Sequence, residues 1–210
     1  MKRLFVYCEG LTEENFTKEI LSKYMLGLGV AVMPIGTGGV SKYSMIKRDL
    51  ARLCKRDKTA MVTTMLDYYG LPNSIPAEDK SSGDIYQKAQ HIEASITKDI
   101  GDLDNLYVNI ILHEFEGLLF TKTSAFKEIA NEKQISELQK ISDSFVTPEH
   151  INDSYDTAPS RRIKRIVPTY AKVSDGVNVA GNIGIDGIAS KCKHFANWIA
   201  KLTAWAKEGS

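Results

Sequence analysis

The segment LFVYCEGLTE, residues 4–13, decides how the rest of the chain is interpreted. Its first five residues form a short apolar run with Phe and Val, which is typical of a buried strand. The run ends at Glu9-Gly10, and apolar residues then repeat at helical spacing from Phe16 to Tyr24. A buried strand followed at once by an amphipathic helix is the opening unit of a parallel, helix-covered sheet.

Three further apolar runs predict three more strands, and helices are predicted between them. The predicted strands cover residues 30–35, 59–66 and 106–112, and the predicted helices cover about 45–58 and 85–100. A polar, proline-containing segment, residues 70–83, is predicted to be a long surface loop. This alternation predicts an α/β fold, with a mostly parallel four-stranded sheet flanked by helices.

The strand signal fades after residue 114, and the second half of the chain is predicted to be helical. Helices are predicted at 114–120, 124–130, 133–143, about 160–166, and 188–205, with a Gly-rich turn region before the last one. The apolar stripe of the last helix, His194, Phe195, Trp198, Leu202 and Trp205, is predicted to be core. We expect a single domain over 1–210, with a core of about 1–120 and a helical C-terminal cap of about 121–210.

The composition limits the classes of protein that the chain can belong to. Its 210 residues are 43% hydrophobic, which is enough for a sizeable core, and its net charge of +1 excludes a strongly basic surface that coats nucleic acid. Cys8, Cys54 and Cys192 form no CxxC pair, so neither a disulfide framework nor a structural zinc site is expected. No apolar stretch reaches the roughly 18 residues of a membrane span, and we expect a cytoplasmic protein.

Three of the four predicted strands end in acidic residues. Glu9 follows the first strand with Glu13 one helical turn later, Asp67 ends the third, and the fourth runs into Glu114 and Glu116. Because parallel strands present their carboxyl ends at one edge of the sheet, we expect these acids to converge. Carboxylate oxygens without clustered Cys or His favour Mg²⁺ or Mn²⁺, which can activate water against a phosphate. The alternative is that such acids only complement helix dipoles.

The densest basic group of the chain lies in the C-terminal half and consists of Arg161, Arg162, Lys164 and Arg165. Our hypothesis is that Arg161, Arg162 and Arg165 bind phosphate, and that Lys172 stabilises charge on the phosphate at the acidic site. The alternative is a solvated helix face, which is the usual role of such runs.

The segment 36–42, GTGGVSK, is a second candidate for phosphate contact. It lacks the G-x-x-x-x-G-K-[ST] spacing of a phosphate-binding loop. A flexible turn is the simpler interpretation, although its backbone N–H groups could contact a phosphate.

The segment 6–13 resembles the opening strand and E-G-x-T-E loop of Toprim domains of the overcoming-lysogenization-defect nuclease type. Over nearly its whole length, the chain resembles a bacterial family catalogued as domain of unknown function 4276, which is similar to Toprim. The residues that carry this resemblance are 66–72, 113–119, 151–153, 158–162, 170–172 and 194–198.

The resemblance implies a Toprim-like fold with Glu9, Glu13 and Asp67 as metal ligands. It also implies association with an ATPase encoded nearby, often in bacterial defence against phage. One position departs from the pattern, since Toprim domains usually carry a D-x-D pair at the third strand and Tyr69 replaces its second acid. Glu114 or Glu116 would have to supply the missing ligand.

Three hypotheses of function follow. The first is a Mg²⁺- or Mn²⁺-dependent nuclease in which Glu9, Asp67, Glu114 and Glu116 hold metal, and Glu9, Glu13, Asp67 and Lys172 take part in catalysis on DNA or RNA. The second is a non-catalytic nucleotide- or nucleic-acid-binding subunit of an ATPase complex. The third is a structural subunit with a helical docking cap, which pairing of the acids with Arg161 or Arg162 would favour.

Overall fold

The structure is a computed structural model that describes residues 1–39, 42–77, 83–152 and 157–208. In it, η1 is a π-helical turn and η2 to η5 are 3₁₀ helices. The elements in chain order are β1 (Lys2–Cys8), α1 (Leu11–Phe16), η1 (Thr17–Leu21), α2 (Ser22–Leu26), β2 (Val30–Gly36), α3 (Tyr43–Arg56), β3 (Met61–Asp67), η2 (Tyr68–Gly70), α4 (Ile85–Ile100), β4 (Leu106–Tyr107), β5 (Ile110–Ile111), η3 (Phe115–Thr121), η4 (Thr123–Phe126), α5 (Glu132–Asp143), η5 (Pro148–His150), α6 (Pro159–Ile166), α7 (Lys172–Ile183), α8 (Ile185–Ala189) and α9 (Lys193–Lys207).

The strands form one parallel sheet, which confirms the predicted α/β fold. The order across the sheet is β2-β1-β3-β4, and β5 pairs with the far end of β3. The predicted strand 106–112 is therefore split in two. The Thr64 hydroxyl donates to the carbonyl oxygen of Asn109 and accepts from its N–H, so a side chain replaces the backbone ladder at that point.

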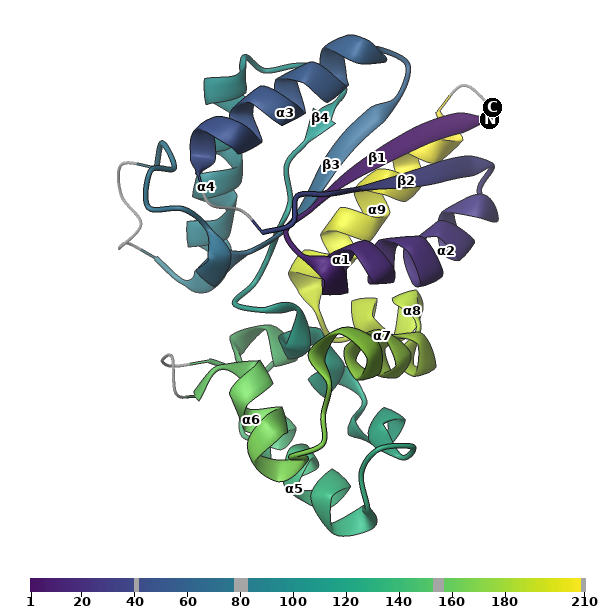
Figure 1. Cartoon of the computed structure of the whole chain (residues 1–210), viewed down its shortest axis with the longest axis vertical. Helices are drawn as coiled ribbons and strands as arrows, with labels where there is room; N and C mark the ends of the chain where they lie inside the picture. The colour runs from purple at the N-terminus through teal and green to yellow at the C-terminus, as the bar shows by residue number, and fades with distance from the viewer. Residues whose placement is uncertain (40–41, 78–82, 153–156, 209–210) are drawn as a thin grey trace.

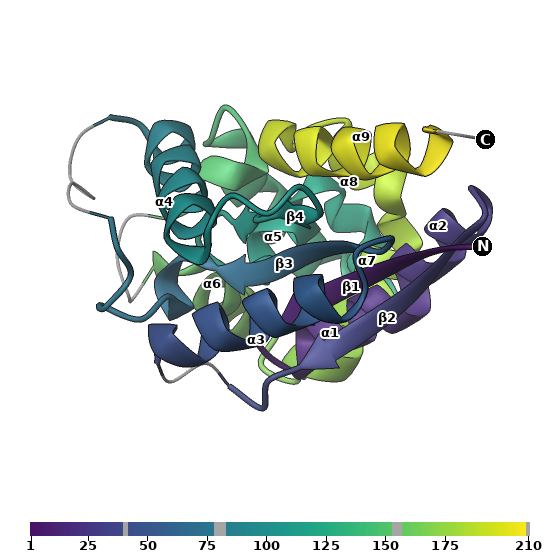
Figure 2. The same ribbon diagram turned by 90° about the horizontal axis from the view of Figure 1, so that it is seen from above.

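Helices cover both faces of the sheet (Figures 1 and 2). Helices α3 and α4 pack on one face through Ile46, Leu50, Ile92 and Ile96. The helical segment from α1 to α2 and helix α9 pack on the opposite face. All residues of β3 are buried, and accordingly its sequence does not alternate between apolar and charged residues; its polar Thr63 and Thr64 are buried as well.

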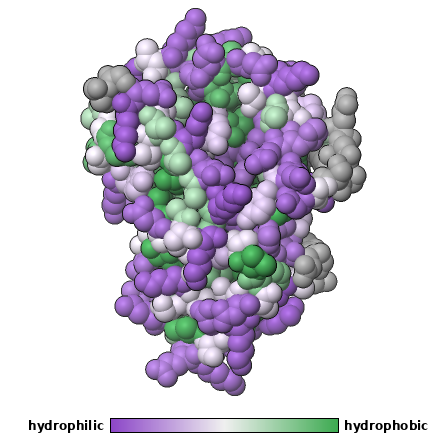
Figure 3. All heavy atoms as spheres, turned by 180° about the vertical axis from the view of Figure 1, so that it is seen from behind, coloured by the Kyte–Doolittle hydropathy of each residue, from purple (hydrophilic) through white to green (hydrophobic). Residues whose placement is uncertain are grey.

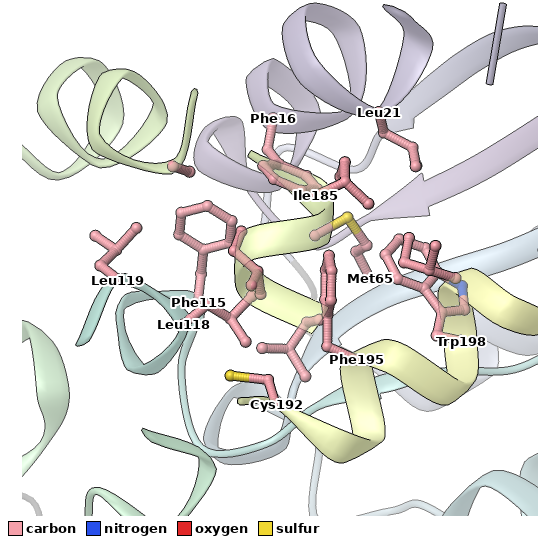
Figure 4. Packing of buried hydrophobic residues seen from close by; sticks show 14 of the residues in the cluster. Phe16, Leu21, Met65, Phe115, Leu118, Leu119, Ile185, Cys192, Phe195 and Trp198 are labelled. Carbon is pink, nitrogen blue, oxygen red and sulfur yellow. The ribbon is translucent and has the colours of Figure 1, made fainter. Parts of the chain in front are cut away.

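One aromatic cluster joins the sheet to the C-terminal half (Figure 4). Phe16 meets Phe115 edge to face at 5.3 Å between ring centroids, and Phe195 meets Trp198 in the same way at 5.6 Å. The indole N–H of Trp198 donates to the Thr63 hydroxyl at 2.9 Å, so α9 is fixed to β3. Burial of His194, Phe195, Trp198 and Leu202 confirms the predicted core stripe, of which only Trp205 is partly exposed.

In the C-terminal half, the predicted helices 114–120 and 124–130 are the 3₁₀ helices η3 and η4, and two larger differences from the prediction follow. The expected Gly-rich turn region contains helix α7, in which Gly176 leaves room for the buried Tyr170 hydroxyl. The expected helix 188–205 is broken between α8 and α9. The Glu149 carboxylate accepts the N–H groups of His194 and Phe195, and this charge stabilises a new helix start there.

The surface carries the polar residues that the composition implies. From behind, most of the molecule is hydrophilic, and hydrophobic side chains show in separate patches (Figure 3). Cys8, Cys54 and Cys192 are buried free thiols. Among the described residues, no helix is long and apolar enough to cross a membrane.

A buried ion pair between α4 and α9 gives the fold a predicted pH dependence. Glu93 Oε1 lies 2.8 Å from His194 Nε2 and also accepts the N–H of Ile110. Burial lowers the pKa of His194, but the hydrogen bond to Glu93 and the negative charges of Glu93 and Glu149 together outweigh burial and leave the pKa raised. The pair therefore stabilises the fold fully below the ordinary histidine pKa of about 6.5, and this contribution is lost as the pH rises through the raised pKa.

Urea unfolding of wild type and Glu93→Gln between pH 5.5 and 9 measures this effect. The Gln side chain keeps an oxygen for Ile110 and removes the charge. We expect the difference in free energy of unfolding between the two proteins to shrink as the pH rises. A difference that stays constant over this range would contradict the pairing.

Candidate functional site

The acids at the ends of β1 and β3 are neighbours, as the parallel pairing predicts. Cys8 lies opposite Met65 in the sheet, and the N–H of Glu9 donates to the carbonyl oxygen of Met65. The Glu9 carboxylate in turn accepts the N–H of Asp67 through Oε2 at 2.7 Å. In Figure 1, these strand ends lie in the middle of the molecule, above the lobe that contains α5 to α8.

The Glu9 carboxylate is held against the backbone of Gly70. A Cβ atom at residue 70 would lie 1.9 Å from Glu9 Oε1, so any side chain there must displace the carboxylate. Gly70 therefore permits a close approach between the backbone of η2 and the acid, which is a common reason for glycine beside a functional group.

Gly70→Ala is expected to move the Glu9 carboxylate while leaving the core intact. If Glu9 is a metal ligand, Mn²⁺ affinity measured by calorimetry should fall together with any cleavage activity. The melting temperature should change little, because the displaced atoms belong to the end of a flexible side chain. Gly27→Ala is the matched control, since its added Cβ makes only an ordinary contact of 3.4 Å. Equal Mn²⁺ affinity of Gly70→Ala and wild type would show that this contact has no role in binding.

The acids after β5 also reach this edge of the sheet. The N–H of Phe115 donates to Asp67 Oδ1 at 3.1 Å, which places η3 beside the end of β3. Glu116 is fully buried, and its Oε2 lies 3.1 Å from Lys172 Nζ. Glu114 Oε2 accepts the N–H of Ser160 at the start of α6.

Glu13 is also buried, but it has a structural role in addition to its place in the cluster. Gly10 is the N-cap of α1, and Glu13 Oε2 accepts the N–H of Gly10 at 3.0 Å, which is the half of a capping box that a glycine cap allows. The alternative that acids complement helix termini therefore applies in part to Glu13 and to Glu114. It applies in part to Asp67 as well, because Asp67 lies at the end of β3 and accepts the N–H of Phe115, the first residue of η3.

The cluster has a large excess of negative charge, with five carboxyl groups and one ammonium group. Burial raises the pKa of Glu9 to about 7, and Glu13 adds to the shift. Burial and the charges of Glu13 and Glu9 raise the pKa of Asp67 well above its usual range. Burial raises the pKa of Glu116 to about 7 although Lys172 opposes the shift. Carboxylates held so close together in a buried site are stable only when protons or a cation neutralise them.

Lys172 carries the counter-charge of the cluster. Burial lowers its pKa, but the attraction of Glu116, Asp67 and Glu114 outweighs burial and raises the pKa above the usual lysine value. Lys172 is therefore a permanent cation at the N-terminus of α7. The acids' described partners include this lysine and several backbone N–H groups.

The donor atoms of the cluster suit a hard divalent cation, but the side chains are not arranged around one. Among the described residues, Glu13 Oε1 and Glu116 Oε1 are buried oxygens that accept no hydrogen bond. Such oxygens are what a cation or water would satisfy. No group of three or more His, Cys, Asp or Glu side chains in the described ranges stands close enough together to hold a metal ion. Metal binding therefore requires side-chain rotation within the cluster.

A basic pocket adjoins the acid cluster. Its volume is about 570 Å³, and its lining residues are Ser160, Arg161, Lys164, Arg165 and Lys172. The three cations of α6 thus face the same cavity as the lysine that pairs with Glu116. We call this cavity the α6 pocket.

Arg162 does not line the α6 pocket, so the structure removes it from the predicted phosphate-binding residues. Its Nε donates to the carbonyl oxygen of Thr157 at 2.6 Å, and its guanidinium group lies over the Phe145 ring. Of the three predicted residues, Arg161 and Arg165 line the α6 pocket and Arg162 does not, whereas Lys164 does. Helical periodicity explains the difference, because Arg162 lies on another face of α6.

Tyr69, which replaces the second acid of the D-x-D pattern, is a surface aromatic residue that is 52% exposed. Its ring stacks on His113 at 5.3 Å between centroids, and its hydroxyl accepts a hydrogen bond from the Asn152 amide. His113 has a φ of 62°, in the left-handed region that non-glycine residues rarely adopt. The turn after β5 is thus held in a strained conformation beside the acids.

Sequence reasoning missed two residues of the site. The sequence predicts Gly70 only as the start of a loop, whereas in the structure it allows the Glu9 carboxylate to approach the backbone. Tyr170 is buried, and burial together with the neighbouring Glu116 raises its pKa above the usual range. The proximity of Tyr170 to Lys172 in the chain was the available signal.

Comparison with known proteins supports the fold. The C-terminal region of the Burkholderia pseudomallei OLD protein superposes with a TM-score of 0.51 at 12% identity, covering 97% of this chain and 98% of that one. The C-terminal region of the Xanthomonas campestris pv. campestris OLD protein gives a TM-score of 0.45 at 16% identity, with 96% and 97% covered. No curated protein matches the sequence.

The likeness to the Burkholderia pseudomallei OLD region agrees with the predicted α/β fold. The family described as Domain of unknown function (DUF4276) matches residues 8–203, which is nearly the whole chain. The chain therefore belongs to the DUF4276 family.

Proposed function

We propose that this protein is a metal-dependent nuclease that hydrolyses phosphodiester bonds at the acid cluster. The observation that carries the proposal is the position of Lys172. Its ammonium group pairs with Glu116 in the cluster and also lines the α6 pocket. A phosphate drawn into this pocket by its cations would therefore lie beside the buried carboxylates.

The proposed roles follow from the contacts. Asp67, Glu9 and Glu116 would hold Mg²⁺ or Mn²⁺, with Glu114 as a further ligand and Glu13 assisting. When bound, the ion would polarise the phosphate and lower the pKa of a coordinated water. Lys172 stabilises charge on the phosphate oxygens, and Arg161, Lys164 and Arg165 hold the neighbouring phosphates of the strand.

A partner is part of the proposal. The resemblance to the overcoming-lysogenization-defect type supports joint action with an ATPase, in bacterial defence against phage. Co-purification of the chain with the product of an adjacent ATPase gene tests this association.

Cleavage of labelled single- and double-stranded DNA and RNA oligonucleotides by the purified protein tests the proposed activity. We expect products with Mg²⁺ or Mn²⁺, no products with a chelator, and greatly reduced cleavage by Lys172→Met. Met keeps much of the length of the lysine stem but removes the charge. If purified wild type cleaves none of the four substrates with either metal, with or without the ATPase, the nuclease proposal is wrong.

The rival proposal is a non-catalytic subunit that binds nucleic acid for an ATPase. The replacement of the second D-x-D acid by Tyr69 and the open arrangement of the carboxylates favour it. It predicts oligonucleotide binding without cleavage at any metal concentration. The same set of oligonucleotides, measured by fluorescence anisotropy, therefore separates the two proposals.

A further inference from the structure

A second cavity lies on the α3 face of the sheet, apart from the α6 pocket. Its volume is about 400 Å³, and we call it the α3 pocket. Its lining residues are Tyr7, Ile35, Gly36, Thr37, Gly39, Met45, Asp49, Arg52, Leu53 and Arg56. Figure 2 shows α3 beside the strands of the sheet, of which β1 and β2 contribute Tyr7, Ile35 and Gly36 to the lining.

The charge of the α3 pocket comes mainly from two arginines. Arg52 and Arg56 are four residues apart on α3, so their side chains lie on the same face of the helix. Both are exposed, and within the described part of the chain neither makes a hydrogen bond or an ion pair. Two guanidinium groups with unused donors on one wall suit a phosphate, which Arg binds in bidentate fashion.

The rest of the pocket lining is mainly apolar and carries one acidic side chain. Ile35, Met45 and Leu53 present apolar surface, with Met45 39% exposed. Asp49 adds a carboxylate, which accepts from Arg48 Nε and from the hydroxyl of the buried Tyr7. An apolar wall with one acceptor next to two phosphate-binding cations matches the chemistry of a nucleobase joined to a phosphate.

The loop after β2 connects this pocket to the acid cluster. Gly38 and Gly39 have positive φ values, and the Thr37 hydroxyl donates to the carbonyl oxygen of Glu9 at 2.7 Å. The Glu14 carboxylate lies against Gly36 on the other side of the loop. The same loop therefore lines the α3 pocket and contacts the end of β1, where Glu9 lies.

We infer that the α3 pocket binds one nucleotide unit, with the phosphate on Arg52 and Arg56 and the base against Ile35, Met45 and Leu53. The unit is either a free mononucleotide or one residue of a nucleic-acid strand that continues to the acid cluster. Binding does not depend on catalysis by the carboxylates, so the inference stands apart from the proposed function.

The test compares the binding of AMP, adenosine, inorganic phosphate and a single-stranded oligo-dA by calorimetry. The variant is Arg52→Gln/Arg56→Gln, and the control is Lys55→Gln/Lys58→Gln, which makes the same charge change at residues outside the pocket. We expect the arginine variant to weaken binding by about tenfold or more, and the control to bind within about twofold of wild type. Adenosine and phosphate alone should bind more weakly than AMP.

The possible results distinguish a free nucleotide from one unit of a nucleic-acid strand, and nucleotide binding from the proposed nuclease activity. Binding of AMP by wild type supports a free nucleotide, and binding of oligo-dA alone supports a unit of a strand. Equal affinity of the arginine variant and wild type for both probes, or no binding of either, overturns the inference. Asp67→Asn should bind AMP with wild-type affinity. A failure of the nuclease proposal can therefore be distinguished from a failure of the nucleotide-binding inference.

Discussion

Asp67→Asn is expected to reduce phosphodiester cleavage strongly without lowering the melting temperature. Asp67 lies at the end of β3, is only 7% exposed, and is near enough to Glu13 and Glu9 for their charges to raise its pKa. Asn keeps a side-chain oxygen for the N–H of Phe115 but removes a charge that the cluster needs to bind a cation. Cleavage should fall by roughly 10²–10³-fold, the loss typical of one electrostatic group at an active site. Because repulsion within the cluster is relieved, the melting temperature at pH 8 should stay the same or rise.

The control for this experiment is Asp186→Asn, which removes an exposed carboxylate from α8. It should leave both cleavage and melting temperature unchanged. Cleavage by Asp67→Asn at the wild-type rate would exclude Asp67 from the catalytic site. A large fall in melting temperature would instead assign Asp67 a structural role, through its hydrogen bond to Phe115.

Lys164→Gln/Arg165→Gln is expected to have the largest effect on nucleic-acid binding. Both side chains line the α6 pocket, and the net charge of +1 gives no general attraction for a polyanion. Each lost phosphate contact should reduce the slope of log affinity against log salt concentration by about 0.7 for a single strand, so the double variant should lose about 1.4. Anisotropy titrations of labelled oligonucleotides at several salt concentrations measure the slope, and the loss should be similar for different sequences.

Lys191→Gln/Lys201→Gln is the matched control, since it removes the same charge from exposed positions on and near α9. It should bind with the wild-type slope. Arg162→Gln is also expected to bind as wild type, because Arg162 lies outside the α6 pocket. If Lys164→Gln/Arg165→Gln keeps the wild-type slope, the basic helix is a solvated or partner-binding face, and the structural-subunit hypothesis gains support.

The convergence of Glu9 and Asp67 could be predicted from the sequence. Both follow short apolar runs of the kind found in parallel sheets, and such strands present their ends at one edge. Periodicity likewise located the core face of α9, where Phe195 and Trp198 are buried. The strands and the core face of α9 can be predicted because the spacing of apolar residues along the sequence reflects which residues are buried.

Other features depend on contacts between distant residues, and sequence patterns do not encode them. The break in the fourth strand is caused by the Thr64 hydroxyl, 45 residues away from Asn109. The start of α9 is stabilised by Glu149, 45 residues before His194. Helix α7 forms although it contains two glycines, which have low helix propensity. Burial of Val177, Val179 and Ala180 outweighs this cost.

The candidate site also combines features that local sequence predicts with features that depend on distant residues. The five acids could be selected as strand-end residues, but the pairing of Glu116 with Lys172 joins positions 56 residues apart. Arg162 lies outside the α6 pocket because of the way α6 is rotated about its axis relative to the rest of the molecule. A run of basic residues in the sequence does not specify this rotation.

The central claim is that the acid cluster binds a divalent cation, and a crystal soaked in Mn²⁺ tests it most directly. We predict an anomalous difference peak coordinated by oxygens of Asp67 and at least one of Glu9 and Glu116, with those side chains rotated from their present hydrogen bonds. The same peak should be absent in Asp67→Asn. No peak at the strand ends in wild type at saturating Mn²⁺, or a peak only at surface carboxylates outside the cluster, would contradict the account.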